Sequence, residues 1–274
     1  MTKMTRPRSH RAIWISDVHL ATRGCKAELL LEFLDQCDPE QLFLVGDIFD
    51  GWRLIRSWYW KPTHSAIIQR VLAMARAGTK VIYVPGNHDE MARDYEGVHL
   101  AGVLVVNEYM YDSADGRRFL VIHGDQFDAI VRYAKWLALV GDWAYQIAIW
   151  ANNWVNRIRG RLGYPYWSLS KYLKHKVKNA VEYISSFETA LATEARRRGA
   201  DGVICGHIHH AEMRMIDGIL YCNDGDWVES CTALVEHHDG RFEIIDWPRE
   251  RQRRAAAPTP ASAPSRGTWP VAAE

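Results

Sequence analysis

The sequence predicts an α/β sandwich, because strand and helix patterns alternate in its first half and hairpin patterns follow near its end. Three short apolar runs in the first half have the length and composition of buried strands: 12–16, 41–45 and 80–84. Between them, residues 26–37 and 63–77 show helical spacing, and Gly78 stands where the second helix should stop. This alternation indicates right-handed crossovers and a sheet that is largely parallel in this region.

The second half of the chain predicts strands of two kinds. Single apolar runs occur at 103–106, 119–122 and 202–205. Four further runs are separated by Asp-Gly or similar turns, which is typical of antiparallel hairpins: 212–216, 219–222, 231–236 and 242–245. The predicted sandwich therefore has one mixed sheet face and one that is more antiparallel.

Length and composition predict one folded domain with irregular ends. The 274 residues are 48% hydrophobic, which is enough for one substantial core. Residues 1–11 are basic and lack the apolar stretch of a secretory signal, so we expect a flexible arm on a cytoplasmic protein. Residues 249–274 are rich in Arg, Ala, Pro and Ser and are expected to form a disordered tail, which leaves 12–248 as the domain.

Charge and cysteine content limit the class of partner. The 34 basic residues are balanced by 33 acidic ones, so the overall charge indicates no polyanionic partner and no nucleic acid is expected. Five cysteines are widely spaced and form no C-x-x-C pair, which is typical of reduced thiols in a cytosolic protein: Cys25, Cys37, Cys205, Cys222 and Cys231.

Polar side chains follow five of the predicted strands, at the point where each strand ends. In open α/β sheets, ligands bind beyond these carboxyl ends, so we expect the side chains to meet. Seven of them offer carboxylate, amide or imidazole atoms without a thiolate: Asp17, His19, Asp47, Asn87, His123, His207 and His209. Any one of these short motifs alone would be an ordinary turn, and it is the ordered set that indicates a metal site.

The ligand types predict two divalent ions. Oxygen and imidazole ligands suit Mn²⁺, with Fe or Zn²⁺ as alternatives. Seven side chains are too many for one ion and fit two ions that share a carboxylate. Only Asp17 and Asp47 return negative charge, so the site keeps an excess positive charge that favours a phosphate. A metal pair about 3.5–4 Å apart can clamp a phosphoryl group and lower the pKa of a bridging water.

Residues 128–187 interrupt the pattern, because they have helical spacing and no strand signal, and we interpret them as a helical cap inserted into the domain. Trp136, Trp143 and Trp150 are seven residues apart and form one stripe on a helix, with basic residues nearby. A single membrane-spanning helix in this segment is excluded, because it would place His123 and His207 on opposite sides of the membrane, whereas both must meet in one site. The cap either packs its aromatics on the domain or receives an acyl chain at a membrane surface, and the basic residues favour the second interpretation.

The ordered motifs D-x-H, G-D-x-x-D, G-N-H-D, H-G and G-H-x-H resemble those of the calcineurin-like metallophosphoesterase superfamily over residues 12–246. The resemblance implies a four-layer α/β/β/α sandwich and an enzyme that hydrolyses phosphoric ester or pyrophosphate bonds. It also implies that one metal is held by Asp17, His19 and His209, that the other is held by Asn87, His123 and His207, and that Asp47 bridges them.

The same resemblance implies that His88 assists catalysis and that Asp50 orients it. The residue types agree with these roles. A leaving oxygen needs a proton or a positive group nearby, and an imidazole held by a carboxylate beside two cations can supply either.

A finer resemblance is to the UDP-2,3-diacylglucosamine diphosphatases of lipid A synthesis. It rests on the position of the cap, on Gly-Asp-x-Phe-Asp-Gly-Trp at 46–52 and on Asp-Trp-Val-Glu-Ser at 226–230. It implies a phosphorylated lipid or nucleotide substrate and a cytoplasmic enzyme, peripheral on the inner membrane. Well-known members of that branch read Gly-Asn-Arg-Asp where this chain has His88, and Gly-His-Thr-His-Arg where it has Gly-His-Ile-His-His, which indicates a paralogous subgroup.

Two other functions remain open on the sequence. One is a generic phosphomonoesterase or phosphodiesterase, and the other is a non-catalytic metal-binding scaffold. The intact ligand set, together with His88, favours an enzyme over a scaffold.

Overall fold

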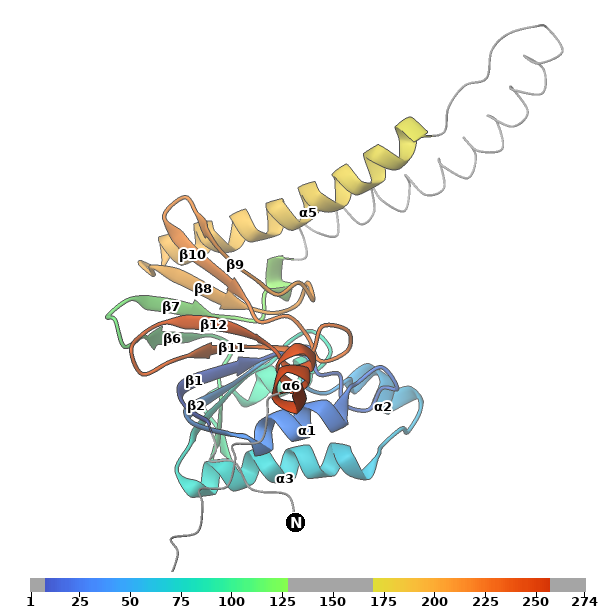
Figure 1. The fold of residues 1–274 in the computed structure, drawn as a ribbon, viewed down its shortest axis with the longest axis vertical. Helices are drawn as coiled ribbons and strands as arrows, with labels where there is room; N and C mark the ends of the chain where they lie inside the picture. Colours follow the sequence, from blue (N-terminus) through green and yellow to red (C-terminus); the bar gives the residue numbers. More distant parts are fainter. Residues whose placement is uncertain (1–7, 128–169, 257–274) are drawn as a thin grey trace, which may run out of the picture.

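The computed structural model describes residues 8–127 and 170–256, with no account of the side chains of 170–183 and 255–256. Within these residues two β-sheets pack face to face and helices cover their outer faces (Figure 1). Three predicted features lie outside the described residues: the tryptophan stripe of the cap, the first residues of the expected arm, and most of the expected tail. No helix among the described residues is long and apolar enough to cross a membrane.

The larger sheet has seven strands, in the order β12-β11-β1-β2-β3-β5-β4. Its strands are β1 (Arg8–Ile15), β2 (Cys37–Val45), β3 (Lys80–Val84), β4 (His99–Leu100), β5 (Val103–Val105), β11 (Thr232–Glu236) and β12 (Phe242–Asp246). The pairs β1–β2, β2–β3 and β3–β5 are parallel, as the strand–helix alternation predicted. The crossover helices are α1 (Ala27–Asp35), α2 (Gly51–Arg56) and α3 (Pro62–Ala77). Gly78 ends α3 in the left-handed conformation, at the predicted position.

The smaller sheet has five strands, in the order β6-β7-β8-β10-β9. They are β6 (Tyr109–Asp112), β7 (Arg118–Val121), β8 (Gly202–Cys205), β9 (Glu212–Ile216) and β10 (Ile219–Asn223). Two short 3₁₀ helices, η1 (Glu90–Tyr95) and η2 (Asp125–Phe127), follow β3 and β7. Helix α5 (Ser170–Arg197) covers the outer face of this sheet, and Figure 1 shows its first part projecting beyond the sheet.

Three buried clusters separate the four layers. One lies between the larger sheet and helices α1 and α3, and includes Leu30 and Phe33. The second lies between the sheets, where the ring of Trp14 stacks on Phe43 with centroids 5.2 Å apart. The third, which includes Phe187, lies between the smaller sheet and α5. Burial of each such aromatic or aliphatic side chain stabilises the fold by roughly 1.5–3 kcal/mol. The three clusters therefore hold the four layers together in this order.

The two C-terminal hairpins are antiparallel, as predicted, but they belong to different sheets. β9 pairs with β10 in the smaller sheet, whereas β11 and β12 extend the larger sheet through the antiparallel pair β1–β11. Both sheets are therefore mixed. β4 and β6 were not predicted, because β4 has only two residues and both are exposed, and only Tyr111 of β6 is buried.

The chain is ordered further toward both ends than the composition predicted. β1 begins at Arg8, and residues 249–256 continue α6 (Trp247–Ala256). The indole of Trp247 is buried against Phe33, and the guanidinium of Arg8 pairs with Glu250. These tertiary contacts stabilise a segment whose own composition favours disorder. Helix α5 likewise runs through residue 187, the expected end of the cap, because its apolar side chains from Phe187 onward pack on the smaller sheet.

Candidate active site

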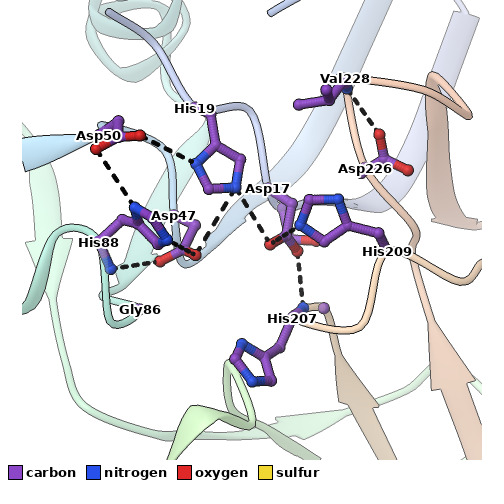
Figure 2. Close-up of polar contacts among 12 residues, drawn as sticks. Asp17, His19, Asp47, Asp50, Gly86, His88, His207, His209, Asp226 and Val228 are labelled. Atoms are coloured by element: carbon purple, nitrogen blue, oxygen red, sulfur yellow. Dashed lines mark hydrogen bonds and ion pairs between the residues drawn. The ribbon is translucent and has the colours of Figure 1, made fainter. Parts of the chain in front are cut away.

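The predicted site residues come together from both sheets. The loops that follow β1, β2 and β3 of the larger sheet meet the loops that follow β7 and β8 of the smaller one, and their side chains converge (Figure 2). Backbone hydrogen bonds join the first two loops, from Asp17 N–H to the carbonyl of Gly46 (3.0 Å) and from His19 N–H to that of Asp47 (2.8 Å).

One cluster of potential metal ligands consists of Asp17, His19 and His209, whose ligand atoms lie within 4.8 Å of one another. The Oδ1 atom of Asp17 is 3.1 Å from Nε2 of His209 and 3.8 Å from Nε2 of His19. The other oxygen, Oδ2, accepts a hydrogen bond from the backbone N–H of His207 (2.7 Å). The Asp17 carboxylate is therefore held by the backbone on one side and open to a cation on the other.

A second cluster consists of Asp47, His123 and His207, again within 4.8 Å. Nδ1 of His123 donates a hydrogen bond to the carbonyl of Val45 (2.8 Å), which leaves Nε2 facing Oδ1 of Asp47 at 3.5 Å. The second oxygen of Asp47 is 3.9 Å from Nε2 of His19, a member of the first cluster. Asp47 therefore lies between the two clusters.

Asn87 lies in the loop that wraps around Asp47. The flanking residue His88 donates its backbone N–H to Oδ1 of Asp47 (2.8 Å), and a Cβ on Gly86 would fall 2.3 Å from the same oxygen. The loop can approach this closely only because residue 86 has no side chain. Gly206 is equally constrained, since a Cβ there would fall 2.2 Å from Oγ of Ser16 and 2.6 Å from Oδ2 of Asp17.

Three buried side-chain atoms of the predicted metal ligands lack a hydrogen-bond partner among the described residues: Asp17 Oδ1, Asn87 Oδ1 and His123 Nε2. A buried polar atom without a partner costs roughly 1–3 kcal/mol, and such atoms are rare in native structures. Each of these atoms has a lone pair suited to a divalent cation. The donor set therefore fits a pair of cations better than it fits a self-contained hydrogen-bond network.

The backbone at the site is held in an uncommon conformation. Nine non-glycine residues in the described part of the chain have positive φ, and five of them are predicted ligands: Asp17, His19, Asp47, His207 and His209. The left-handed conformation costs an ordinary residue roughly 1–2 kcal/mol. Such conformations cluster at functional sites, where the surrounding structure holds them in place.

Charge interactions within the clusters change the proton affinities of their members. Burial lowers the pKa of His123, but the Asp47 carboxylate 3.5 Å from Nε2 and the charge of Asp17 outweigh burial and raise that pKa to about 10. Burial alone would raise the pKa of Asp47, but the His123 partner and the His88 N–H hold that pKa well below its usual value. Asp47 is therefore ionised throughout the physiological range and is available as a ligand.

His88 forms a third group of potential ligands with His19 and Asp47, again within 4.8 Å of one another, and its ring is held from three sides. Its Nδ1 is 3.3 Å from Oδ1 of Asp50, and its Nε2 is 3.9 Å from Oδ2 of Asp47. The indole of Trp52 packs against the imidazole, with centroids 4.5 Å apart, and the imidazole of His19 meets it edge-on at 4.7 Å. The side chain of His88 keeps a quarter of its surface exposed, so it can reach a substrate.

Asp89 and Asp125 support the site without joining a cluster. The carboxylate of Asp89 accepts backbone hydrogen bonds from Asp47, Ile48 and Gly86 and so joins two ligand loops. Asp125 pairs with the guanidinium of Arg93 at 2.7 Å.

Asp224 and Asp226 also support the site, and only Asp226 belongs to a motif noted in the sequence, without a role. The buried carboxylate of Asp224 accepts a hydrogen bond from Oγ of Ser16 (2.5 Å), next to Asp17, and Asp226 accepts the backbone N–H of Val228 (2.7 Å; Figure 2). Only the geometry reveals that they shape the site.

The four-layer sandwich and its histidine–carboxylate clusters define a phosphoester hydrolase of the metal-dependent class. The chain belongs to the calcineurin-like phosphoesterase family, whose pattern matches residues 10–211.

Among curated proteins, the chain is 26% identical over 239 residues to a UDP-2,3-diacylglucosamine hydrolase of Xanthomonas campestris pv. campestris, covering 83% of this chain and 96% of that protein. It is 25% identical over 233 residues to a protein of the same name from Neisseria meningitidis serogroup B, covering 82% and 92%. Among solved structures, the phosphopantetheinyl hydrolase of Mycobacterium tuberculosis aligns with 17% identity and a TM-score of 0.41, covering 95% of this chain and all of that one. Zinc-bound Vps29 of Entamoeba histolytica aligns with 14% identity and a TM-score of 0.42, covering 86% and 98%.

Proposed function

We propose that this hydrolase uses two divalent ions, most simply Mn²⁺, held on either side of Asp47, whose carboxylate both ions would share. Asp17, His19 and His209 hold one ion, and Asn87, His123 and His207 hold the other. The single observation that carries the proposal is the position of Asp47, with one oxygen 3.5 Å from His123 and the other 3.9 Å from His19. When bound, the ions neutralise phosphate charge and activate the attacking water.

The catalytic role of the chain's own residues centres on His88. Asp50 faces Nδ1 of His88 and favours a proton on that nitrogen. Nε2 is directed toward the Asp47 carboxylate, and in the doubly protonated imidazolium form it can donate a hydrogen bond or a proton to an oxygen of the phosphoryl group or the leaving group. The packed rings of Trp52 and His19 limit rotation of the imidazole. Asp50 and Trp52 are positioning residues in this scheme.

For the substrate, we favour a pyrophosphate or phosphodiester of a lipid-linked or nucleotide compound such as UDP-2,3-diacylglucosamine. The support comes from the names of the relatives that align over most of both chains and from the Gly-Asp-x-Phe-Asp-Gly-Trp run at 46–52. A protein acting on such a lipid would work at the cytoplasmic face of the inner membrane as a peripheral enzyme.

One residue favours a second candidate, a phosphomonoesterase or phosphodiesterase with a different substrate. His88 stands where the enzymes of the resembled branch have Arg. A guanidinium offers a fork of donors to a phosphate, whereas an imidazole offers one directed donor, so the two side chains do not hold the same diphosphate in the same way.

Assays of the purified protein with Mn²⁺ separate these candidates. The test compares UDP-2,3-diacylglucosamine, bis(p-nitrophenyl) phosphate and p-nitrophenyl phosphate for the wild type and for His88→Arg. Preference of the wild type for the lipid nucleotide supports the first substrate class. Preference for the small esters, with a gain of lipid-nucleotide cleavage in His88→Arg, supports the second. Absence of Mn²⁺-dependent cleavage of all three would favour the non-catalytic scaffold.

A further inference from the structure

An exposed apolar patch lies beside the candidate active site. We define this rim patch as Trp52 and Ile55 on α2, Trp58 in the segment after α2, and Met91 on η1. Their exposed fractions are 47%, 79%, 78% and 57%. Scattered apolar residues on a surface need no explanation, but a group of large ones at one place marks an interaction site.

The rim patch is fixed to the catalytic loops through short backbone links. Asp50 caps α2 by accepting the N–H of Arg53 (2.9 Å), and Gly51 donates its N–H to the carbonyl of His88 (2.9 Å). The methyl group of Met91 lies beside Gly51, and the indole of Trp52 packs on His88. Figure 1 shows α2 at the outer edge of the molecule, so the patch combines a peripheral position with direct contact to the site.

The charge along the α2 part of the rim patch has one sign, whereas Met91 on η1 follows the exposed acidic residue Glu90. Residues 51–61 contain Arg53, Arg56 and Lys61 and no acidic residue. Lys61 pairs with Glu28 at 3.3 Å, whereas Arg53 and Arg56 are exposed and form no ion pair with any described residue. These two guanidinium groups lie beside exposed Trp and Ile side chains. The combination complements a lipid layer, whose headgroups can be anionic and whose interior is apolar.

We propose that the rim patch docks this protein on the surface of a membrane that contains anionic lipids. Ile55 and Trp58 enter the boundary between headgroups and acyl chains, while Arg53 and Arg56 face lipid phosphates. The proposal deepens the proposed function and rests on it in one respect, since docking here would present the site to a lipid-linked substrate. Aromatic and basic residues together could also bind single-stranded nucleic acid, but Ile55 and Met91 offer no ring for base stacking and favour the lipid.

Vesicle sedimentation of the full chain tests the proposal. Vesicles of phosphatidylglycerol and phosphatidylcholine are compared with vesicles of phosphatidylcholine alone for the wild type, for Ile55→Glu/Trp58→Glu, and for Met215→Glu. Met215 is a matched control, because it is 61% exposed on β9 in the other sheet. We expect the wild type to bind the anionic vesicles and the double variant to lose at least about tenfold in partition coefficient, with Met215→Glu unchanged. High salt should weaken wild-type binding by screening the arginines.

Three results would overturn the docking surface. The first is equal binding of the wild type and the double variant, which would place the contact elsewhere. The second is absence of wild-type binding to the vesicles. The third is binding to a single-stranded oligonucleotide in place of vesicles. Thermal unfolding verifies that the variants fold. Asp47→Ala separates this proposal from the proposed function, because it should bind vesicles like the wild type and yet lack hydrolytic activity.

Discussion

The Nδ1 atom of His88 lies 3.3 Å from Oδ1 of Asp50, and the same oxygen accepts the backbone N–H of Arg53 at the start of α2. One carboxylate therefore fixes both the imidazole and the helix that carries Trp52. We predict that Asp50→Asn, which keeps a hydrogen-bond acceptor but removes the charge, lowers kcat by about tenfold to a hundredfold and changes KM little.

A double-mutant cycle isolates this relationship from a structural effect. Asp50→Asn should have almost no further effect on kcat in a His88→Ala background, because the imidazole that it orients is absent. Metal content should remain that of the wild type, since Asp50 belongs to neither ligand set. An undiminished effect of Asp50→Asn in the His88→Ala background would show that Asp50 acts through another group.

Metal affinity should increase with pH. The pKa of His123 is raised to about 10, so its imidazole carries a second proton at neutral pH in the free protein, and the raised pKa of His209 favours a second proton there too. A cation must displace these protons, and each displaced proton changes the apparent Kd by about tenfold per pH unit below the pKa of its imidazole. Calorimetry of Mn²⁺ binding at pH 6.5 and 8, in buffers of different ionisation enthalpy, measures the affinity and the protons released. An affinity independent of pH would contradict this account of His123.

Gly206→Ala should disable the site without unfolding the protein. The new methyl group would fall 2.6 Å from Oδ2 of Asp17 and 2.2 Å from Oγ of Ser16, so the ligand must move. We expect a loss of activity of about a hundredfold or more and loss of bound metal, measured by turnover and by elemental analysis.

Gly116→Ala is the matched control for Gly206→Ala. Gly116 lies in the β6–β7 turn at φ +86°, with nothing within 4 Å of an added Cβ. This substitution should cost about 1–2 kcal/mol of folding stability and leave turnover unchanged. Equal activities for the two variants would show that the close approach at Gly206 is unimportant.

His10 should make the fold less stable in acid. Burial, with the nearby charges of His237 and Arg8, lowers its pKa from 6.5 to about 4. Between pH 6.5 and 4 the unfolded chain binds a proton that the folded protein does not, so the free energy of unfolding falls as pH decreases. After allowance for solvent screening, the loss is roughly 2 kcal/mol.

Urea unfolding with EDTA, measured across this pH range, tests the role of His10. His10→Asn cannot titrate, so its stability should decrease less than that of the wild type. His99→Asn, at an exposed position in β4, should follow the wild type. Parallel pH curves for the wild type and His10→Asn would contradict the prediction.

The central strands and the ligand loops were predictable because their signals are local. Buried parallel strands are continuous apolar runs, and the ligands follow directly where those runs end, as Asp17 follows β1 and Asp47 follows β2. The sequence did not predict which sheet each C-terminal hairpin joins. The pairing of β11 with β1 joins residues far apart in the chain, and hydrophobic alternation within a strand does not specify its partner.

The features that the sequence did not reveal depend on tertiary contact. Helix α6 forms because Trp247 is buried, although its composition predicts disorder. The rim patch is recognisable only once Trp52 and Met91 are seen at one edge of the site. The positive φ angles of the ligands likewise have no sequence signature, because Asp and His are not required at such positions.

The central claim is that Asp47 joins two metal-binding clusters in one hydrolytic site. Its most direct test is the rate of Mn²⁺-dependent hydrolysis of bis(p-nitrophenyl) phosphate by Asp47→Ala, beside Asp239→Ala as a control at an exposed carboxylate. We predict that Asp47→Ala loses more than about a thousandfold in rate, equivalent to about 4 kcal/mol of transition-state stabilisation, while Asp239→Ala retains wild-type activity. Undiminished turnover by Asp47→Ala would contradict the two-metal site.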